Sequence, residues 1–303
     1  MSLLALLFAL FCERGLTHLL HLRELRWLDP YFDQAERALA GRSGAIVGVA
    51  ALLLVALPVL PVVLVARWLD PRLLGLLEFA FAVGVLLFSF GPRDLKDEVD
   101  DYVAALEGRD HEEAARRGED LLESSPKALG SGAREAVEEA IFIQANNRIF
   151  GVIFWFMVLG AGGAWLYRVS DMLRRRAAIE AARRGVPRVQ GDLGSVLVVL
   201  HGILAWLPAR LTALAYAFAG SLEDAVGNWR SAVQQLGPAS GVLDRAEDLL
   251  AHVGKGSLQP SLAEVPAERI DVATARGAWR IVQRALWIWL AAIALLVITG
   301  AVV

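Results

Sequence analysis

The sequence is poor in cysteine and carries little net charge. Its 303 residues include one cysteine, Cys12, so no disulfide can form within the chain. The formal net charge is −3 and no basic cluster is interleaved with aromatic residues, which argues against nucleic acid as a partner. Charged residues make up only 21% of the chain and hydrophobic ones 56%, above the roughly 45–50% typical of soluble domains. This composition predicts a polytopic membrane protein in contact with the lipid bilayer.

Uncharged runs mark the membrane segments. Residues 45–66 carry no charge over 22 positions, enough for a spanning helix, which Pro58 and Pro61 are expected to kink. Residues 73–90 are expected to return across the bilayer, and residues 285–303 form a C-terminal anchor. Residues 2–12 are too short to cross about 30 Å of hydrocarbon and lack the basic start and cleavage site of a signal peptide. We therefore expect an uncleaved helix there that lies on the membrane or dips into it.

Two segments are polar enough to lie in water. Residues 91–148 contain fifteen acidic and eight basic residues, with i,i+4 pairs such as Glu112–Arg116 that indicate helices. Breaks are expected at 124–126 and 130–132. In residues 219–284, LEDAVGNWRSAVQQL and VLDRAEDLLAHV predict helices, and two prolines predict a loop over 255–268. Both segments are therefore predicted to be helical insertions between membrane segments.

The stretch from Glu138 to Arg210 combines apolar runs with polar residues. The runs 149–167 and 193–218 are joined by a basic linker, 168–192, with seven arginines and three acidic residues. Arg210 lies inside the second run, where an arginine costs roughly 2.5–3.5 kcal/mol on membrane-insertion scales. Such a residue normally faces protein or a watery cavity. We therefore predict a polar pocket at the membrane surface in this stretch.

Arginines also predict the orientation. Arg276, Arg280 and Arg284 precede the last anchor and no basic residue follows it, which places 219–284, and with it 91–148, in the cytoplasm. The two runs either both cross or both re-enter. Re-entry keeps the basic linker inside, and the Gly160–Gly163 cluster and Pro208 offer bends, so we favour re-entry and leave crossing open.

The predicted fold is all-α: a polytopic helical membrane protein with re-entrant or broken helices and cytoplasmic helical insertions. Its predicted segments are 1–44 (amphipathic, on the membrane surface), 45–90 (transmembrane hairpin), 91–148 (acidic insertion), 149–218 (core site segment), 219–284 (cytoplasmic helices) and 285–303 (anchor).

Four short motifs resemble the AmpE/CobD-CbiB family over nearly the whole chain. They are FCERGL near the start, E-x7-N at Glu139–Asn147, a glycine-interrupted run ending in Tyr167-Arg168, and WLPARLTAL around Arg210. The resemblance is closest to the AmpE branch. It implies a multi-pass protein of the bacterial inner membrane with a sensory or regulatory role in β-lactamase induction and peptidoglycan-recycling signalling. It also implies an AmpD-type protein partner.

The CobD/CbiB branch implies a different activity, ATP-dependent amide formation between an aminopropanol unit and cobyric acid, with ATP and Mg²⁺ as cofactors. Against its motifs, this chain keeps an asparagine at Asn147 but has Phe150 in place of an aspartate. After the matching Tyr167-Arg168, the asparagine position holds Asp171 and the aspartate position holds Arg174. Ahead of the retained Pro208–Leu211, its paired aspartates and asparagine correspond to His201, Gly202 and Ala205.

These replacements remove carboxylates that would hold Mg²⁺ against phosphates. We therefore expect no catalytic residue and no metal site, and a pocket whose donors bind an anion such as a nucleotide or a muropeptide. The predicted ligand-binding residues are Arg210, Asn147, Arg148, Glu139, Arg168, Asp171 and His201. The amide synthase and a muropeptide transport component remain alternatives.

Several of these residues also have a structural explanation. Glu139 fits an exposed helical charge, and His201 fits a hydrogen-bonded interior histidine. Arg168 and Arg174–Arg176 fit anchors to lipid headgroups. The sequence leaves the identity of the ligand and the oligomeric state open.

Overall fold

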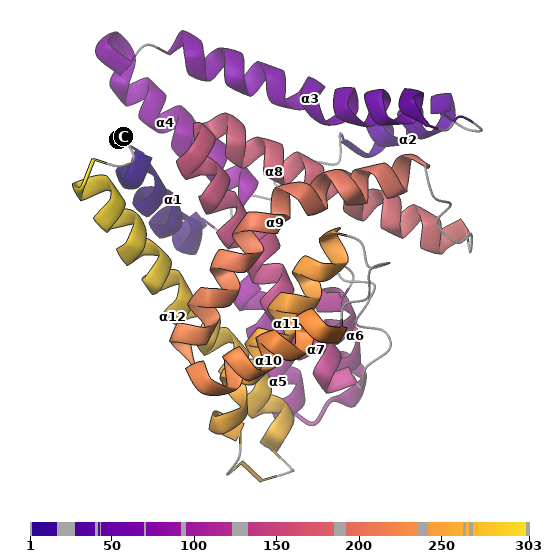
Figure 1. Ribbon diagram of the computed structural model, residues 1–303, viewed down its shortest axis with the longest axis vertical. Helices are drawn as coiled ribbons and strands as arrows, with labels where there is room; N and C mark the ends of the chain where they lie inside the picture. Colours follow the sequence, from indigo (N-terminus) through magenta and orange to yellow (C-terminus); the bar gives the residue numbers. More distant parts are fainter. Residues whose placement is uncertain are drawn as a thin grey trace. The chain divides into compact units, whose positions relative to one another are not determined.

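The structure, a computed structural model, contains helices and no strand among the residues that it describes (Figure 1). Those residues are 2–16, 28–39, 42, 44–69, 71–91, 95–122, 133–184, 192–235, 242–262, 265–266 and 269–300. The chain is an all-α polytopic membrane protein, as its composition predicts. The expected breaks at 124–126 and 130–132 lie outside the described residues.

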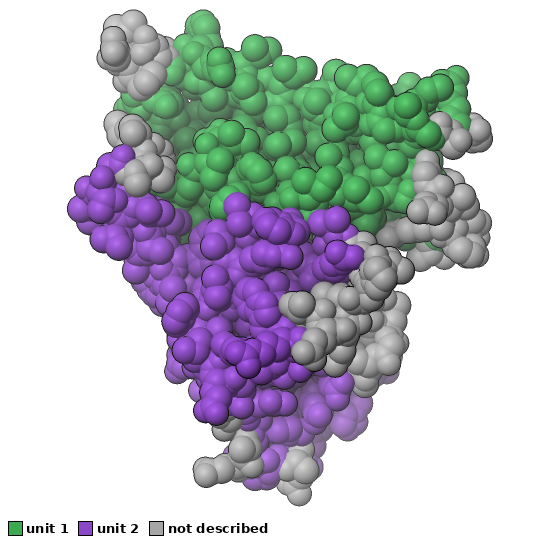
Figure 2. All heavy atoms as spheres, in the orientation of Figure 1, with its two compact units in different colours: residues 1–92, 151–204, 302–303 green, residues 93–150, 205–301 purple. Residues whose placement is uncertain are grey.

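The chain forms two compact units, coloured in Figure 2. Unit 1 comprises residues 1–92, 151–204 and 302–303, and unit 2 comprises residues 93–150 and 205–301. The helices that begin in unit 1 are α1 (Ser2–Leu16), α2 (Leu28–Leu39), α3 (Ala45–Trp68), α4 (Pro71–Ser89), α8 (Gly151–Arg184) and α9 (Leu193–Ala219). Those of unit 2 are α5 (Leu95–Glu107), α6 (His111–Leu122), α7 (Ala133–Ala145), the π-helix η3 (Asn146–Phe150), α10 (Leu222–Gln235), α11 (Val242–Leu262) and α12 (Ile270–Ile298).

Four helical stretches are long and apolar enough to cross a membrane: Ala45–Trp68, Arg134–Ala181, Leu193–Ala219 and Ile270–Ile298. Large apolar side chains such as Leu52, Leu53 and Leu57 of α3 are exposed, as expected of a lipid-facing surface. The apolar part of α4, Gly75–Ser89, is shorter than the roughly 20 residues of a straight crossing. A return crossing by this segment stays a prediction.

Helix α8 turns back on itself at Gly160. This residue has φ 67° and ψ −155°, a conformation that breaks the helix. A Cβ on Gly151 would lie 2.3 Å from Cζ of Tyr167. In a straight helix, the 16 residues between these positions would span about 24 Å. The bend predicted at the glycine cluster is therefore present, and re-entry of the run 149–167 stays a prediction.

Side chains of α2 and α8 donate hydrogen bonds to backbone carbonyls of α3 near its first proline. Pro58 has no N–H, so it leaves the carbonyl of Leu54 without its helical donor. The Tyr31 hydroxyl on α2 donates to that carbonyl at 3.1 Å. The Trp165 indole N–H on α8 donates to the carbonyl of Pro58 itself at 3.0 Å. Helix α3 thus continues through both prolines, and side chains of α2 and α8 donate to its backbone carbonyls at Leu54 and Pro58.

Two linker predictions are wrong. Residues 168–184 of the predicted basic linker continue α8, and residues 255–262 of the predicted loop continue α11. In α11 the reason is packing: a Cβ on Gly254 would lie 2.4 Å from the Phe142 ring, so the glycine permits contact between α11 and α7. Tertiary contact outweighs the weak helix propensity of glycine and proline there.

Other predicted elements hold. The i,i+4 pairs Glu112–Arg116 and Glu113–Arg117 form on α6 at 2.7 Å and 2.8 Å. Helix α10 spans Leu222–Gln235, close to the predicted segment. The backbone of α9 stays helical through Pro208, so this proline does not end the helix, and the bend that the re-entrant scheme places there stays a prediction.

Candidate functional site

In unit 1, three arginines of α8 share one buried carboxylate. Asp171 is fully buried. Its Oδ1 accepts a bond from Nη2 of Arg174 at 2.7 Å, and its Oδ2 lies 2.8 Å from Nε of Arg175 and 3.4 Å from Nη1 of Arg168. Because these residues are three or four positions apart on one helix, they project from the same face. We call Arg168, Asp171, Arg174 and Arg175 the α8 arginine cluster.

His201 of α9 completes the surroundings of this carboxylate. Its Nε2 lies 3.8 Å from Oδ1 of Asp171, and its ring stacks at a tilt on Tyr167. The Ser170 hydroxyl donates its single hydrogen to the carbonyl of Tyr167 at 2.7 Å. The 2.9 Å contact between Ser170 Oγ and His201 Nδ1 then requires Nδ1 to be the donor. His201 is thus an interior histidine with a fixed ring orientation, as its structural explanation predicts.

Burial contradicts the headgroup explanation for two arginines. Arg168 is 3% and Arg174 4% exposed, so neither reaches a lipid headgroup. Arg176, by contrast, points toward α2 and bonds both oxygens of Asp33 at 3.0 Å and 3.1 Å. The predicted site residues Arg168, Asp171 and His201 therefore come together, and Arg176 belongs to a different contact.

In unit 2, polar residues surround the π-helix η3. The Thr212 hydroxyl donates to Oδ1 of Asn146 at 3.1 Å, and the Asn146 amide donates to Oδ1 of Asn147 at 3.5 Å. A π-helical turn is rare and frequently occurs at functional sites. Asn147 is almost fully buried beside this turn. The side-chain amide of Asn147 therefore remains a candidate hydrogen-bond donor to a ligand.

Two predicted site residues of unit 2 have partners within the protein. Arg148 is buried, donates from Nη1 to Glu98 at 2.8 Å and from Nε to Gln144 at 3.0 Å. Glu139 accepts from Nζ of Lys255 at 2.5 Å, with its side chain 23% exposed. Glu139 is therefore not the freely exposed charge of the structural explanation. Sequence reasoning missed Glu98 and Lys255 because each lies 50 or more residues from its partner.

Arg210 has partners on its own helix. Its Nη1 donates to the carbonyl of Trp206 at 2.9 Å, and its guanidinium carbon lies 4.0 Å from the centre of the Trp206 ring. Among the described residues no carboxylate lies within ion-pair distance of it. The side chain is half-buried. Cation–π contact and one carbonyl reduce the cost of placing this charge in an apolar run.

The donor set does not fit an ATP–Mg²⁺ centre. Phe150 is fully buried and packs against Tyr216 and Trp289 at centroid distances of 6.0 Å and 5.6 Å. Asp171 has both oxygens bonded to arginine, and Glu139 is paired with Lys255. No three metal-ligating side chains gather within the described part of the chain. Mg²⁺ needs carboxylate oxygens facing it, and these carboxylates face arginine and lysine instead.

Comparison with known proteins adds a family relationship. Residues 6–243 match the family described as CobD/Cbib protein. The chain is 31% identical over 205 residues to the cobalamin biosynthesis protein CobD of Stutzerimonas stutzeri, covering 67% of this chain and 63% of that protein. It is 30% identical over 167 residues to the cobalamin biosynthesis protein CobD of Chromobacterium violaceum, covering 55% and 51%. The chain thus spans between half and two thirds of these relatives' lengths. No solved structure matches it.

Proposed function

The chain belongs to the CobD/CbiB family, and from this premise we propose that it is a ligand-binding, regulatory member rather than an amide synthase. In this proposal it is of the AmpE type. It acts in β-lactamase induction and peptidoglycan-recycling signalling, on the cytoplasmic side of the bacterial inner membrane. Its ligand is an anion such as a muropeptide or a nucleotide, and an AmpD-type protein is its candidate partner.

The observation that carries the proposal is the α8 arginine cluster. Asp171 holds three guanidinium groups in fixed directions. Fixed planar guanidiniums suit bidentate recognition of a carboxylate or phosphate, because little side-chain freedom is lost on binding. In this scheme Arg175, whose side chain is 17% exposed, is the donor that meets the ligand, and the buried Arg168, Arg174 and Asp171 are positioning residues. Arg210, in unit 2, is a separate candidate donor, since its partners among the described residues are limited to Trp206.

The second candidate function is amide formation with ATP, as in cobamide biosynthesis. One observation favours it: both relatives above are named as cobalamin biosynthesis proteins. Against it stands the donor set, in which Phe150 and Arg174 occupy the positions where the resemblance places aspartates. The synthase requires carboxylates that hold Mg²⁺. Glu139 would have to supply one of them after its ion pair with Lys255 is broken.

Thermal unfolding of the purified protein tests the binding proposal. An anhydro-muropeptide at 100 times its Kd should stabilise the protein by about 2.7 kcal/mol. Arg175→Gln should remove most of this shift, because Arg175 bonds Asp171 and keeps part of its side chain accessible.

Arg176→Gln is the matched control, since this neighbouring arginine of α8 pairs with Asp33 instead. An equal loss of the shift in both variants, or in neither, would count against the cluster as the site. ATP with Mg²⁺ as the probe, tested the same way, distinguishes a nucleotide from a muropeptide as the ligand.

A further inference from the structure

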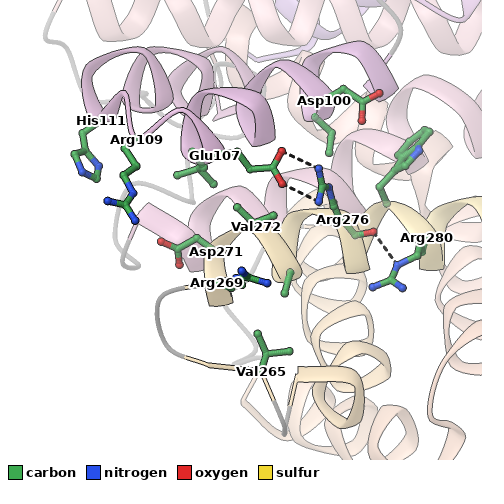
Figure 3. A pocket seen from close by; sticks show the side chains of 14 residues that line it. Asp100, Glu107, Arg109, His111, Val265, Arg269, Asp271, Val272, Arg276 and Arg280 are labelled. Carbon is green, nitrogen blue, oxygen red and sulfur yellow. Dashed lines mark hydrogen bonds and ion pairs between the residues drawn. The ribbon is translucent and has the colours of Figure 1, made fainter.

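A second group of arginines lies in unit 2, around a pocket of about 1210 Å³. The pocket is formed by the end of α5, the turn after it, the start of α6 and the first turns of α12 (Figure 3). Its charged lining consists of Asp100, Glu107, Asp271, Arg109, Arg269, Arg276 and Arg280, together with His111. None of these residues belongs to the site described above.

The acidic residues of this pocket are already paired with basic ones. Glu107 receives two bonds from Arg276, at 2.9 Å and 3.0 Å (Figure 3). Asp100 pairs with Lys96 at 2.6 Å, and Asp271 lies 3.9 Å from Arg134. The carboxylates are therefore neutralised by cations, of which Lys96 and Arg134 lie outside the lining.

Three arginines remain without an acidic partner among the described residues. Arg280 donates only to the carbonyl of Arg276, at 3.4 Å. Arg109 and Arg269 have no side-chain hydrogen bond or ion pair to any described residue. The lining has four arginines against three carboxylates, an excess of one positive charge, which rises to three when the partners Lys96 and Arg134 are counted.

The other walls match a ligand with an apolar part. Val99, Val265 and Val272 line the pocket, and so does Trp279. The indole Nε1 of Trp279 is buried and has no hydrogen-bond acceptor among the described residues. A buried donor without an acceptor is rare in folded proteins and needs an explanation.

The backbone at Arg109 is a second, independent observation. Arg109 has φ 54°, the left-handed conformation that normally holds glycine at the end of a helix. Its N–H donates to the carbonyl of Leu106, and the N–H of Asp110 to that of Ala105, which closes the end of α5. A non-glycine residue here is less stable than glycine would be. An arginine at this position therefore requires a reason beyond the turn, and Figure 3 places its side chain at the pocket.

We propose that this pocket binds a phosphate- or diphosphate-bearing ligand, with Arg109, Arg269, Arg280 and the Trp279 indole N–H as donors and the three valines beside its apolar part. Several guanidiniums whose neighbouring carboxylates are already paired with other cations suit a multiply charged oxyanion better than a single carboxylate. The ligand is either a free phosphate compound or the headgroup of an anionic lipid. The site is independent of the α8 arginine cluster, so either can fail alone.

The test measures binding of inorganic pyrophosphate to the full-length protein by calorimetry, against sodium chloride of equal ionic strength. Arg269→Gln should weaken binding roughly tenfold, as expected for loss of one charge-assisted hydrogen bond. Arg109→Gly should weaken it similarly while leaving the unfolding temperature unchanged or raised, because glycine suits the left-handed turn. Arg230→Gln, an exposed arginine of α10 outside the pocket, should leave binding unchanged.

Nanodiscs distinguish the two sources of the phosphate. Pyrophosphate binding that persists in nanodiscs of phosphatidylglycerol indicates a free ligand. Pyrophosphate binding that occurs in phosphatidylcholine nanodiscs but is lost in phosphatidylglycerol nanodiscs indicates that anionic headgroups compete for the pocket. Absence of pyrophosphate binding in phosphatidylcholine, or equal binding by wild type, Arg109→Gly and Arg269→Gln, overturns the proposal.

Discussion

Asp171 and Arg174 form a buried ion pair, with Oδ1 and Nη2 2.7 Å apart. By resemblance to the CobD/CbiB branch, these are the positions of an asparagine and an aspartate. The two departures from that motif thus contact each other. In this chain the carboxylate lies about one helical turn before the position where the resemblance places an aspartate, and that position holds its counter-ion. The ion pair neutralises both charges on this helix face. It also leaves no carboxylate at the position where the synthase would use one.

Asp171→Asn should be strongly destabilising. The change leaves Arg168, Arg174 and Arg175 without the carboxylate that they share, and breaking a buried pair typically costs about 3–5 kcal/mol. Adding Arg174→Asp restores one acid beside the remaining arginines and should recover part of this loss. Thermal unfolding in detergent measures both. Equal stability of the single and double variants would show that the pair is not coupled.

Gly151→Ala should destabilise the α8 hairpin. The added methyl would lie 2.3 Å from Cζ of the buried Tyr167, and such overpacking costs typically about 1–3 kcal/mol. Gly84→Ala in α4 is the control, since its Cβ meets nothing within 4 Å. It should be neutral or stabilising by up to about 1 kcal/mol. Similar unfolding temperatures for the two variants would contradict the hairpin contact.

Arg148 should contribute much more to the stability of the protein than Arg210. Arg148→Met leaves the mostly buried Glu98 carboxylate, 11% exposed, without its cation and should cost up to about 3–5 kcal/mol. Arg210→Gln removes only contacts to Trp206, so stability should change by about 0.5 kcal/mol or less. Chemical or thermal unfolding of both variants tests this. A large loss of stability in Arg210→Gln would instead indicate an essential internal partner for this side chain.

Cysteine labelling tests the predicted orientation. With Cys12 replaced by serine, Glu112→Cys on α6 and Glu223→Cys on α10 place single thiols at exposed positions of the two insertions. A membrane-impermeant maleimide should label neither in intact cells and both after permeabilisation, because the arginines before the last anchor predict a cytoplasmic side. Labelling of either thiol in intact cells would place that insertion outside.

Much of the helical fold follows from local sequence. The uncharged run 45–66 gives α3 at Ala45–Trp68, since helix is the way for a single apolar run to satisfy its backbone in lipid. The glycine cluster likewise gives the turn at Gly160. Composition misled at 168–184, where many arginines suggested a solvated linker. The spacing of Tyr167, Asp171 and Arg174 on one helix face was the available signal.

The candidate sites depend on contacts that local patterns do not encode. Glu98 and Arg148 are 50 residues apart, and Glu139 and Lys255 are 116 apart. The pocket of unit 2 joins the end of α5 to the start of α12, more than 150 residues later. Pairings at such separations are set by packing of the whole unit, so residue type alone suggested ligands where the structure has ion pairs.

The most direct test of the central claim is ATP turnover by the purified protein with Mg²⁺, cobyric acid and an aminopropanol substrate, compared with Glu139→Gln. The account predicts no amide product and no Mg²⁺-dependent ATP hydrolysis in either protein, because Asp171 and Glu139 are committed to basic partners. Amide formation, or ATP hydrolysis that Glu139→Gln abolishes, would contradict it and establish the synthase.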